Sequence, residues 1–181
     1  RFDNKRGFIL SSNGNVNAHQ YTALDGGRTL VSWEVLNEIP FFDTAAANKG
    51  LLWWSHDIGG YMGGVEDAEL YMRYVQMGVY SPLLRLSSKR GKYYKREPWK
   101  WDVKTLKIVK DYLQMRHRLI PYLYTEGYKY HQTGKPLIEP LYYQNPEIYD
   151  EPKYKNEYYF GSELLVCPIT KQKDTVMNRT V

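Results

Sequence analysis

The sequence predicts an α/β fold with a parallel sheet, and two observations carry this prediction. Short apolar runs alternate with longer segments of helical periodicity, in the order strand, helix, strand, helix, strand, helix, strand. One apolar run, residues 51–54, passes directly into Ser55-His56-Asp57-Ile58-Gly59-Gly60, as strands do at the active-site end of a parallel barrel. Four strand–helix units are half of an eight-stranded barrel. A half barrel has two open edges, so we expect further polypeptide or a second copy to complete it.

The first half of the chain is predicted to hold two strands and two helices. Residues 7–11 form a short buried strand, followed by a polar, Asn-rich loop. Apolar spacing then predicts a helix over residues 30–48, which Pro40 should break or kink. The run at 51–55 is the second strand. A helix over 66–79 follows, and its acidic first turn suits the positive end of the helix dipole.

The second half is predicted to hold two more strands around one long helix. Residues 82–86 form the third strand. Asp102 is a favourable N-cap for a helix that Gly134 ends and Pro121 kinks. Residues 137–143 then form the fourth strand. This order completes the alternation expected of a parallel α/β sheet.

Composition narrows the classes of partner. The chain has 181 residues, a net charge of +5 and 18 tyrosines. Its densest basic run, residues 89–96, contains two tyrosines and could bind phosphate or single-stranded nucleic acid. The charge is too evenly mixed along the chain to favour that function, so no nucleic-acid partner is predicted.

Other residue patterns argue against several kinds of site. Cysteines and histidines do not occur at metal-ligand spacings, and no apolar stretch reaches membrane-spanning length. The sequence therefore predicts no metal, no organic cofactor and no membrane partner. The single cysteine, Cys167, cannot form an internal disulfide, and no signal peptide is recognisable. These features predict a cytoplasmic location.

Four polar residues could carry chemistry. Asp57 ends a strand beside two glycines, where a carboxylate can bind substrate hydroxyls or act as an acid or base; alternatively it bonds loop amides. His56 could orient Asp57, bind a ligand or pack as support. Arg85 ends the third strand and is expected to pair with a carboxylate such as Asp57. Asp25, in an Asp-Gly-Gly-Arg-Thr turn, is either a turn residue or a catalytic carboxylate.

A series of motifs extends along nearly the whole chain, at residues 31–34, 45–50, 53–60, 69–74, 97–99, 116–124, 134–141 and 160–166. In sequence and order the set resembles glycoside hydrolase family 31, a family of retaining α-glucosidases. The resemblance implies the second half of a (β/α)8 TIM barrel over residues 1–148. It also implies the start of a C-terminal β domain over residues 149–181.

The resemblance also implies roles for individual residues. The family uses a nucleophile and an acid/base through a covalent glycosyl-enzyme. Its nucleophile motif, Trp-x-Asp-Met-Asn-Glu, does not occur in this chain, so the nucleophile is expected outside it. Asp57 matches the family's substrate-binding aspartate, and Arg85 matches an arginine that supports the sugar site. The family pattern also suggests that three neighbours shape the pocket: Trp54, His56 and Tyr61.

Three positions depart from the family pattern. Arg28 stands where the acid/base aspartate is expected, Ser12 where a sugar-binding arginine is expected, and Ser87 where a histidine is expected. Arginine stays protonated at ordinary pH and cannot replace a carboxylic acid as proton donor. Asp25 lies three residues away and could substitute only if the turn is remodelled.

The resemblance therefore implies part of an α-glycosidase that hydrolyses O-glycosyl bonds of α-glucoside-like substrates by the retaining route. Activity is not expected from this chain alone, because the nucleophile is missing. An anionic glycoside bound through Arg28 is a second possibility. A third is a catalytically degenerate barrel that only binds carbohydrate. The expected partners are a carbohydrate and the missing half of the barrel or a second copy.

Overall fold

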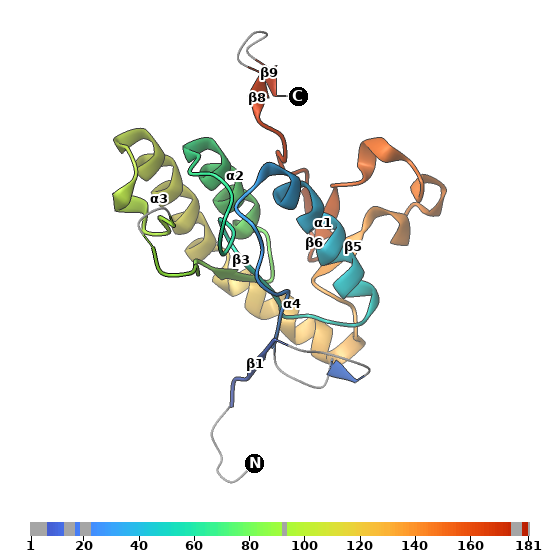
Figure 1. Cartoon of the computed structure of the whole chain (residues 1–181). Helices are drawn as coiled ribbons and strands as arrows, with labels where there is room; N and C mark the ends of the chain where they lie inside the picture. The colour runs from blue at the N-terminus through green and yellow to red at the C-terminus, as the bar shows by residue number, and fades with distance from the viewer. Residues whose placement is uncertain (1–6, 13–16, 19–22, 92–93, 175–178, 181) are drawn as a thin grey trace.

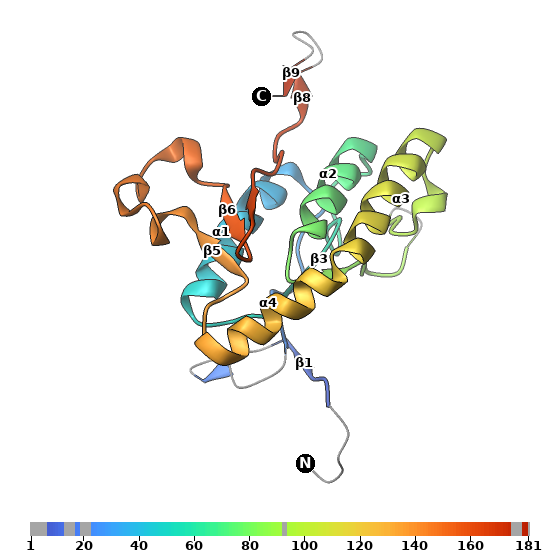
Figure 2. The same cartoon turned by 180° about the vertical axis from the view of Figure 1, so that it is seen from behind.

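The computed structural model describes residues 7–12, 17–18, 23–91, 94–174 and 179–180 (Figure 1). The first and the last described segments, residues 7–12 and 179–180, lie at opposite ends of the molecule (Figures 1 and 2). A parallel sheet with its helices forms the first part of the chain, and antiparallel strands form the last part. The predicted α/β class is confirmed.

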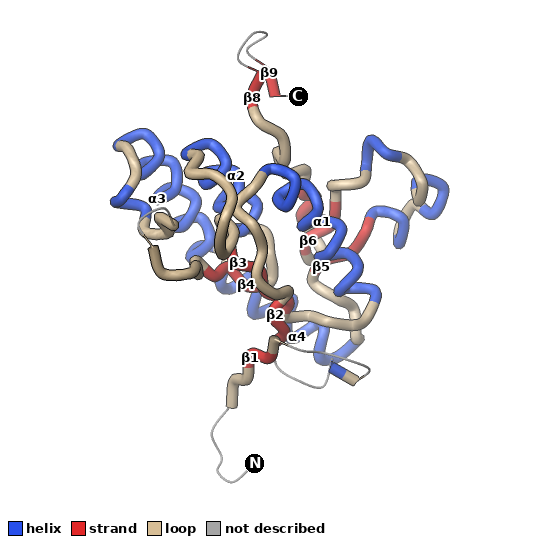
Figure 3. The backbone as a smooth tube through the Cα atoms, viewed as in Figure 1, coloured by secondary structure: helices blue, strands red, loops and turns tan. Residues whose placement is uncertain are grey.

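Four parallel strands build the first sheet in the order β1-β2-β3-β4 (Figure 3). They are β1 (Leu10–Ser11), β2 (Ala23–Asp25), β3 (Trp54–Asp57) and β4 (Leu83–Arg85). The register sets Asp25 opposite Ser55 and Asp57 opposite Arg85. The carboxyl ends of β2, β3 and β4 therefore lie side by side, which is the arrangement that brings functional residues together in parallel barrels.

Three strand predictions need correction. Strand β2 was not predicted, because its three residues are too short for a periodic pattern and lie between polar residues and glycines. The first strand was predicted to be buried, whereas Phe8 and Ile9 are 63% and 59% exposed beside β1. The strand predicted over 137–143 does not join the parallel sheet: β5 (Ile138–Pro140) pairs antiparallel with a later strand.

Three helices share the first hydrophobic core. They are α1 (Trp33–Asn48), α2 (Ala68–Val79) and α3 (Val103–Arg118). Their N-caps are Ser32, Asp67 and Asp102, whose side chains accept hydrogen bonds from backbone amides of the first turn. Pro40 lies inside α1 without ending it, so the predicted break is wrong and the alternative, a kink, stays a prediction. The core contains Leu36, Ile39, Ile58, Leu70, Tyr74, Val75 and Val109.

The long helix predicted from Asp102 to Gly134 is two helices. Helix α3 ends at Arg118, and α4 (Ile120–Thr133) begins two residues later. Pro121 lies in the first turn of α4, where its missing N–H costs no helical hydrogen bond. Gly134 ends α4 in the left-handed region with φ 74°, as predicted.

Antiparallel strands begin a second core beside α4 (Figure 2). Strand β5 pairs with β6 (Tyr158–Phe160), which pairs with β7 (Leu164–Val166). Two further strands, β8 (Lys173–Asp174) and β9 (Arg179–Thr180), form a separate hairpin. Strand β7 lies within the sequence motif at residues 160–166. The domain boundary after residue 148 stays a prediction. The second core contains Leu52, Leu123, Leu137, Ile138, Tyr158, Phe160 and Val166.

Within the described part of the chain, no helix has the length and apolar character needed to cross a membrane. The cytoplasmic location stays a prediction.

Candidate functional site

Three consecutive strands of the parallel sheet end in a charged residue. Asp25 ends β2, Asp57 ends β3 and Arg85 ends β4. Nη2 of Arg85 lies 2.9 Å from Oδ1 of Asp25 and 3.0 Å from Oδ1 of Asp57. The two carboxylate oxygens that share this nitrogen therefore lie no more than about 6 Å apart. The predicted pairing of Arg85 with Asp57 is confirmed, and Asp25 joins it.

Strand geometry explains this cluster. Side chains alternate between the faces of a strand, so Ser55 and Asp57 share one face of β3. Nε of Arg85 donates a hydrogen bond of 3.2 Å to Oγ of Ser55, which fixes the guanidinium on that face. The Asp25 carboxylate also accepts the Gly27 N–H at 3.1 Å, in a turn closed by the aspartate side chain.

Burial raises the pKa of Asp57 by more than the neighbouring groups lower it. Its side chain is only 2% exposed. This burial raises the pKa of Asp57 above its ordinary value, because the low-dielectric surroundings disfavour the charged form. The positive charge of Arg85 lowers the pKa, and the negative charge of Asp25 raises it. The Ser87 side chain and His56 both lower it. Predicted site residue Ser87 therefore lies close enough to act on Asp57.

Three loops at this edge of the sheet are joined by backbone hydrogen bonds. The amides of Tyr61 and Met62, after β3, donate to the carbonyl of Thr29, after β2. The Lys89 amide, after β4, donates to the Tyr61 carbonyl at 2.9 Å. Buried Arg96 adds a side-chain link, because its Nε and Nη2 donate to the Gly60 carbonyl at 3.1 and 2.5 Å. The loop that follows Asp57 is thus held from two sides.

Trp54 and His56 lie on the other face of β3. Nε2 of His56 is 2.5 Å from Oδ1 of Asp43 on α1, and both side chains are buried. The Trp54 and His56 rings contact each other edge to face. Gly26 makes room for both, because a Cβ there would lie 3.0 Å from the Trp54 ring. His56 thus connects the strand to a helix, and the pocket roles predicted for these two residues stay predictions.

Arg28 and Tyr61 contact each other at the edge of the site. The Arg28 side chain is exposed, and its Cζ lies 5.0 Å from the centre of the Tyr61 ring. No described carboxylate forms an ion pair with Arg28. Ser12 is exposed at the end of β1. The structure therefore brings Asp25, Asp57, Arg85 and Ser87 together and leaves Arg28 on the rim.

Sequence reasoning missed three residues that hold this arrangement: Ser55, Asp43 and Arg96. Alternation along β3 could have identified Ser55 as the neighbour of Asp57 on one face. Asp43 and Arg96 carry no such signal, because their partners lie on distant segments. The described residues contain no group of three or more His, Cys, Asp or Glu side chains placed to hold a metal ion.

Two family models match the chain. The model of the glycosyl hydrolases family 31 TIM-barrel domain matches residues 1–126, and that of the family 31 C-terminal domain matches residues 134–181. The chain belongs to glycosyl hydrolase family 31. The predicted resemblance is confirmed: the four parallel strands are half of the family barrel, and the antiparallel strands begin its C-terminal domain.

Curated family 31 relatives match almost the whole chain. Neutral alpha-glucosidase C of Mus musculus is 32% identical over 92% of this chain, and alpha-glucosidase 2 of Bacillus thermoamyloliquefaciens is 30% identical over 94%. An alpha-xylosidase of Saccharolobus solfataricus is 27% identical over 94%. The chain covers 18%, 22% and 24% of these relatives, so it spans about a fifth of their length.

Solved family 31 structures share the fold. The Flavobacterium johnsoniae dextranase, complexed with isomaltotriose, superposes with a TM-score of 0.85 at 29% identity. The match covers 96% of this chain and 22% of the dextranase. The cycloalternan-degrading enzyme of Trueperella pyogenes has a TM-score of 0.84 at 27% identity, covering 93% of this chain and 25% of its own.

Proposed function

We propose that this chain is the sugar-holding half of a family 31 barrel that hydrolyses O-glycosyl bonds of α-glucoside-like substrates by the retaining route. The observation that carries the proposal is the cluster of Asp57, Arg85 and Asp25 at the ends of three consecutive strands. Parallel barrels place their active sites at this edge. The names of the relatives support an α-glycoside substrate, and the dextranase structure contains an α-glucan fragment.

Asp57 and Arg85 would act as a unit. The guanidinium forms an ion pair with Oδ1 of Asp57, without a hydrogen bond of good geometry, and is itself held by a hydrogen bond to Ser55. A carboxylate held in this way accepts hydrogen bonds from sugar hydroxyls with its remaining acceptor capacity. Tyr61 and Ser87, on the two loops that follow β3 and β4, would border the same sugar.

The two carboxyl groups of the retaining reaction would not both come from this half. The nucleophile motif of the family is absent from the sequence. Arg28 at the acid/base position cannot donate a proton as a carboxylic acid does. Oδ1 of Asp25 is engaged by Arg85 and by the Gly27 amide, so this oxygen is not free to serve a leaving group.

That geometry favours a second candidate, a barrel that binds α-glycosides without cleaving them. Its supporting observation is the replacement of the expected acid by exposed Arg28, together with the engaged Asp25. The two candidates share the sugar site at Asp57 and differ only in whether the barrel cleaves the glycosidic bond.

The test uses the assembled barrel, meaning this chain together with the polypeptide that supplies the other strands. Hydrolysis of 4-nitrophenyl α-glucoside, with a glycosyl-enzyme trapped by a 5-fluoro glucosyl fluoride, would establish the enzyme. Maltose binding without turnover would establish the binding barrel. Under both candidates Asp57→Ala should abolish sugar binding, and unchanged maltose affinity in that variant would refute the sugar site itself.

A further inference from the structure

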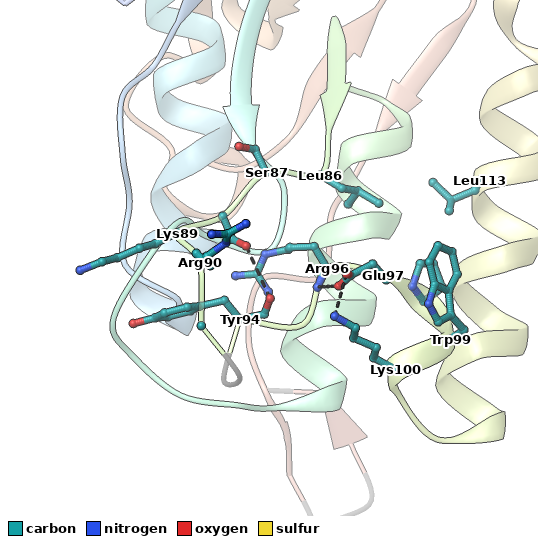
Figure 4. Close-up of a pocket in the computed structure, with 13 residues that line it drawn as sticks. Leu86, Ser87, Lys89, Arg90, Tyr94, Arg96, Glu97, Trp99, Lys100 and Leu113 are labelled. Atoms are coloured by element: carbon teal, nitrogen blue, oxygen red, sulfur yellow. Dashed lines mark hydrogen bonds and ion pairs between the residues drawn. The ribbon is translucent and has the colours of Figure 1, made fainter.

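A large groove opens next to the sugar site. Its volume is about 1080 Å³, slightly above the usual range of ligand pockets, and it is lined by described residues between Leu86 and Lys100 and by Leu113 of α3 (Figure 4). Ser87 lines the groove and also acts on the Asp57 carboxylate. The groove therefore continues from the site that ends in Asp57 and Arg85.

The described side chains that line the groove carry more positive than negative charge. Glu97 is its single acidic lining residue among those described, and it pairs with Lys100 at 2.7 Å. The Arg96 guanidinium donates to the carbonyls of Gly60 and Lys95. Lys89 and Arg90 are exposed, and neither forms an ion pair with a described carboxylate. Two cations in the groove thus have no acidic partner in the described part of the chain.

An exposed aromatic ring lies on the other side of this groove. Trp99, in the short 3-10 turn Pro98–Lys100, leaves 71% of its surface exposed. Figure 4 shows its indole on one side of the pocket and the Lys89 side chain on the opposite side. Aromatic faces bury apolar surface well, and an exposed indole next to a groove offers a flat surface on which a sugar ring can stack.

We propose that this groove binds an acidic oligosaccharide that extends from the sugar held at Asp57. Its anionic groups, carboxylate or sulfate, pair with Lys89 and Arg90, and one of its rings stacks on Trp99. The inference rests on the proposed sugar site, which it deepens by naming the substrate class. Arg28, which lies beside Tyr61 and forms no ion pair with a described carboxylate, adds positive charge to the approach of such a ligand.

The test measures dissociation constants of the assembled barrel by calorimetry. The probes are an oligogalacturonate hexamer, a heparin hexasaccharide and neutral maltohexaose. The double substitution Lys89→Gln/Arg90→Gln should weaken the binding of an acidic probe about tenfold, which is the loss of affinity expected for two exposed charge pairs. It should leave maltohexaose unchanged. Preference for the hexuronate or for the heparin fragment identifies which anionic group is bound.

The matched control is Lys107→Gln/Lys110→Gln, which removes the same charge from an exposed part of α3 outside the groove. If the two double variants lose the same affinity for the acidic probe, the effect comes from net charge alone and the proposal is overturned. Trp99→Ala should weaken both the acidic and the neutral hexamer, and no effect on either would overturn the stacking role.

Two further outcomes separate this inference from the proposed function. If maltohexaose binds in an Asp57-dependent way but neither acidic hexamer binds more tightly, the groove proposal fails and the sugar site stands. If no probe depends on Asp57, the sugar site fails as well. A 12-nucleotide single-stranded DNA that outcompetes both acidic hexamers, and loses affinity in Lys89→Gln/Arg90→Gln, would assign the groove to nucleic acid instead.

Discussion

At the scale of single residues, the sharing of Arg85 between two carboxylates defines the site. Arg85 is permanently charged, so it holds Asp57 and Asp25 in place at any ordinary pH. Asp57 is nonetheless buried deeply enough that its pKa is raised. The site therefore combines a fixed cation with a carboxylate whose charge depends on pH.

Sugar binding should be lost on acidification at an unusually high pH. In the proposed sugar site Asp57 would bind hydroxyls as the ionised carboxylate, and it loses that charge as the pH falls through its raised pKa. Maltose affinity of the assembled barrel should fall with a midpoint above about 3.9, the ordinary value for aspartate. A midpoint at or below that value would contradict the raised pKa. Asp57→Asn should remove the pH dependence together with most of the affinity.

Asp25→Asn should move that midpoint to lower pH. The negative charge of Asp25 raises the pKa of Asp57. Removing that charge also leaves Asp57 as the only described carboxylate that pairs with the Arg85 guanidinium. Both changes favour the ionised form of Asp57. The measurement is the same pH titration of maltose affinity. Glu38→Gln, which changes a half-exposed carboxylate on α1 paired with Lys155, is the control and should leave the midpoint unchanged. A rise in the midpoint would show that Asp25 acts on Asp57 in another way.

At the scale of elements, the site depends on the loop between β3 and α2. Gly60 and Gly64 both have positive φ and lie against the segment that leads into α1. A Cβ at Gly64 would stand 1.9 Å from the carbonyl oxygen of Val31, whose neighbour in the chain is the N-cap of α1. The glycines therefore allow two loops to approach more closely than any side chain would permit.

Gly64→Ala should destabilise the protein far more than Gly134→Ala. Both glycines have φ 74°, so both substitutions carry the left-handed backbone cost of about 1–2 kcal/mol. A Cβ at Gly134 meets nothing within 4 Å, whereas Gly64 adds a backbone clash. Urea unfolding of both variants measures the difference in free energy of unfolding. Similar losses would show that Val31 moves aside, and failure of Gly64→Ala alone to fold would agree with the clash.

At the scale of the whole molecule, the parallel sheet is open. Its four strands are half of the family barrel, and among the described residues β1 and β4 each pair with a strand on one side only. Phe8 and Ile9 are exposed beside β1. Unpaired edges and exposed apolar side chains favour association with another strand. We expect either the other half of the barrel or a second copy of the chain to cover these edges.

The chain alone should therefore self-associate. Light scattering after size exclusion should give a mass above the 21.4 kDa of one chain. Phe8→Lys/Ile9→Lys should reduce that association, because charged side chains on an edge oppose strand pairing. Phe41→Lys/Phe42→Lys, which changes two exposed aromatic residues on α1, is the control. A monodisperse monomer for the unmodified chain would contradict this prediction.

The sequence by itself determined the local features. A few adjacent residues are enough to predict four features: the N-cap at Asp102, the helix end at Gly134, strand β4 and the position of Asp57 at a strand end. The family also follows from the sequence, because its motifs are short and lie in order along the chain. Each of these features depends on side-chain type and spacing alone.

Only the tertiary structure decided how distant segments meet. Strand β2 exists because β1 and β3 pair with it on both sides, not because of its three residues. Strand β5 left the parallel sheet because β6 pairs with it antiparallel. Three roles were open for His56, and the structure shows that its side chain contacts Asp43 on α1. The Asp25 side chain reaches Arg85 across the intervening strand β3. Pairing partners and the face on which a side chain lies are set by contacts between residues far apart in the chain, and these are absent from a local pattern.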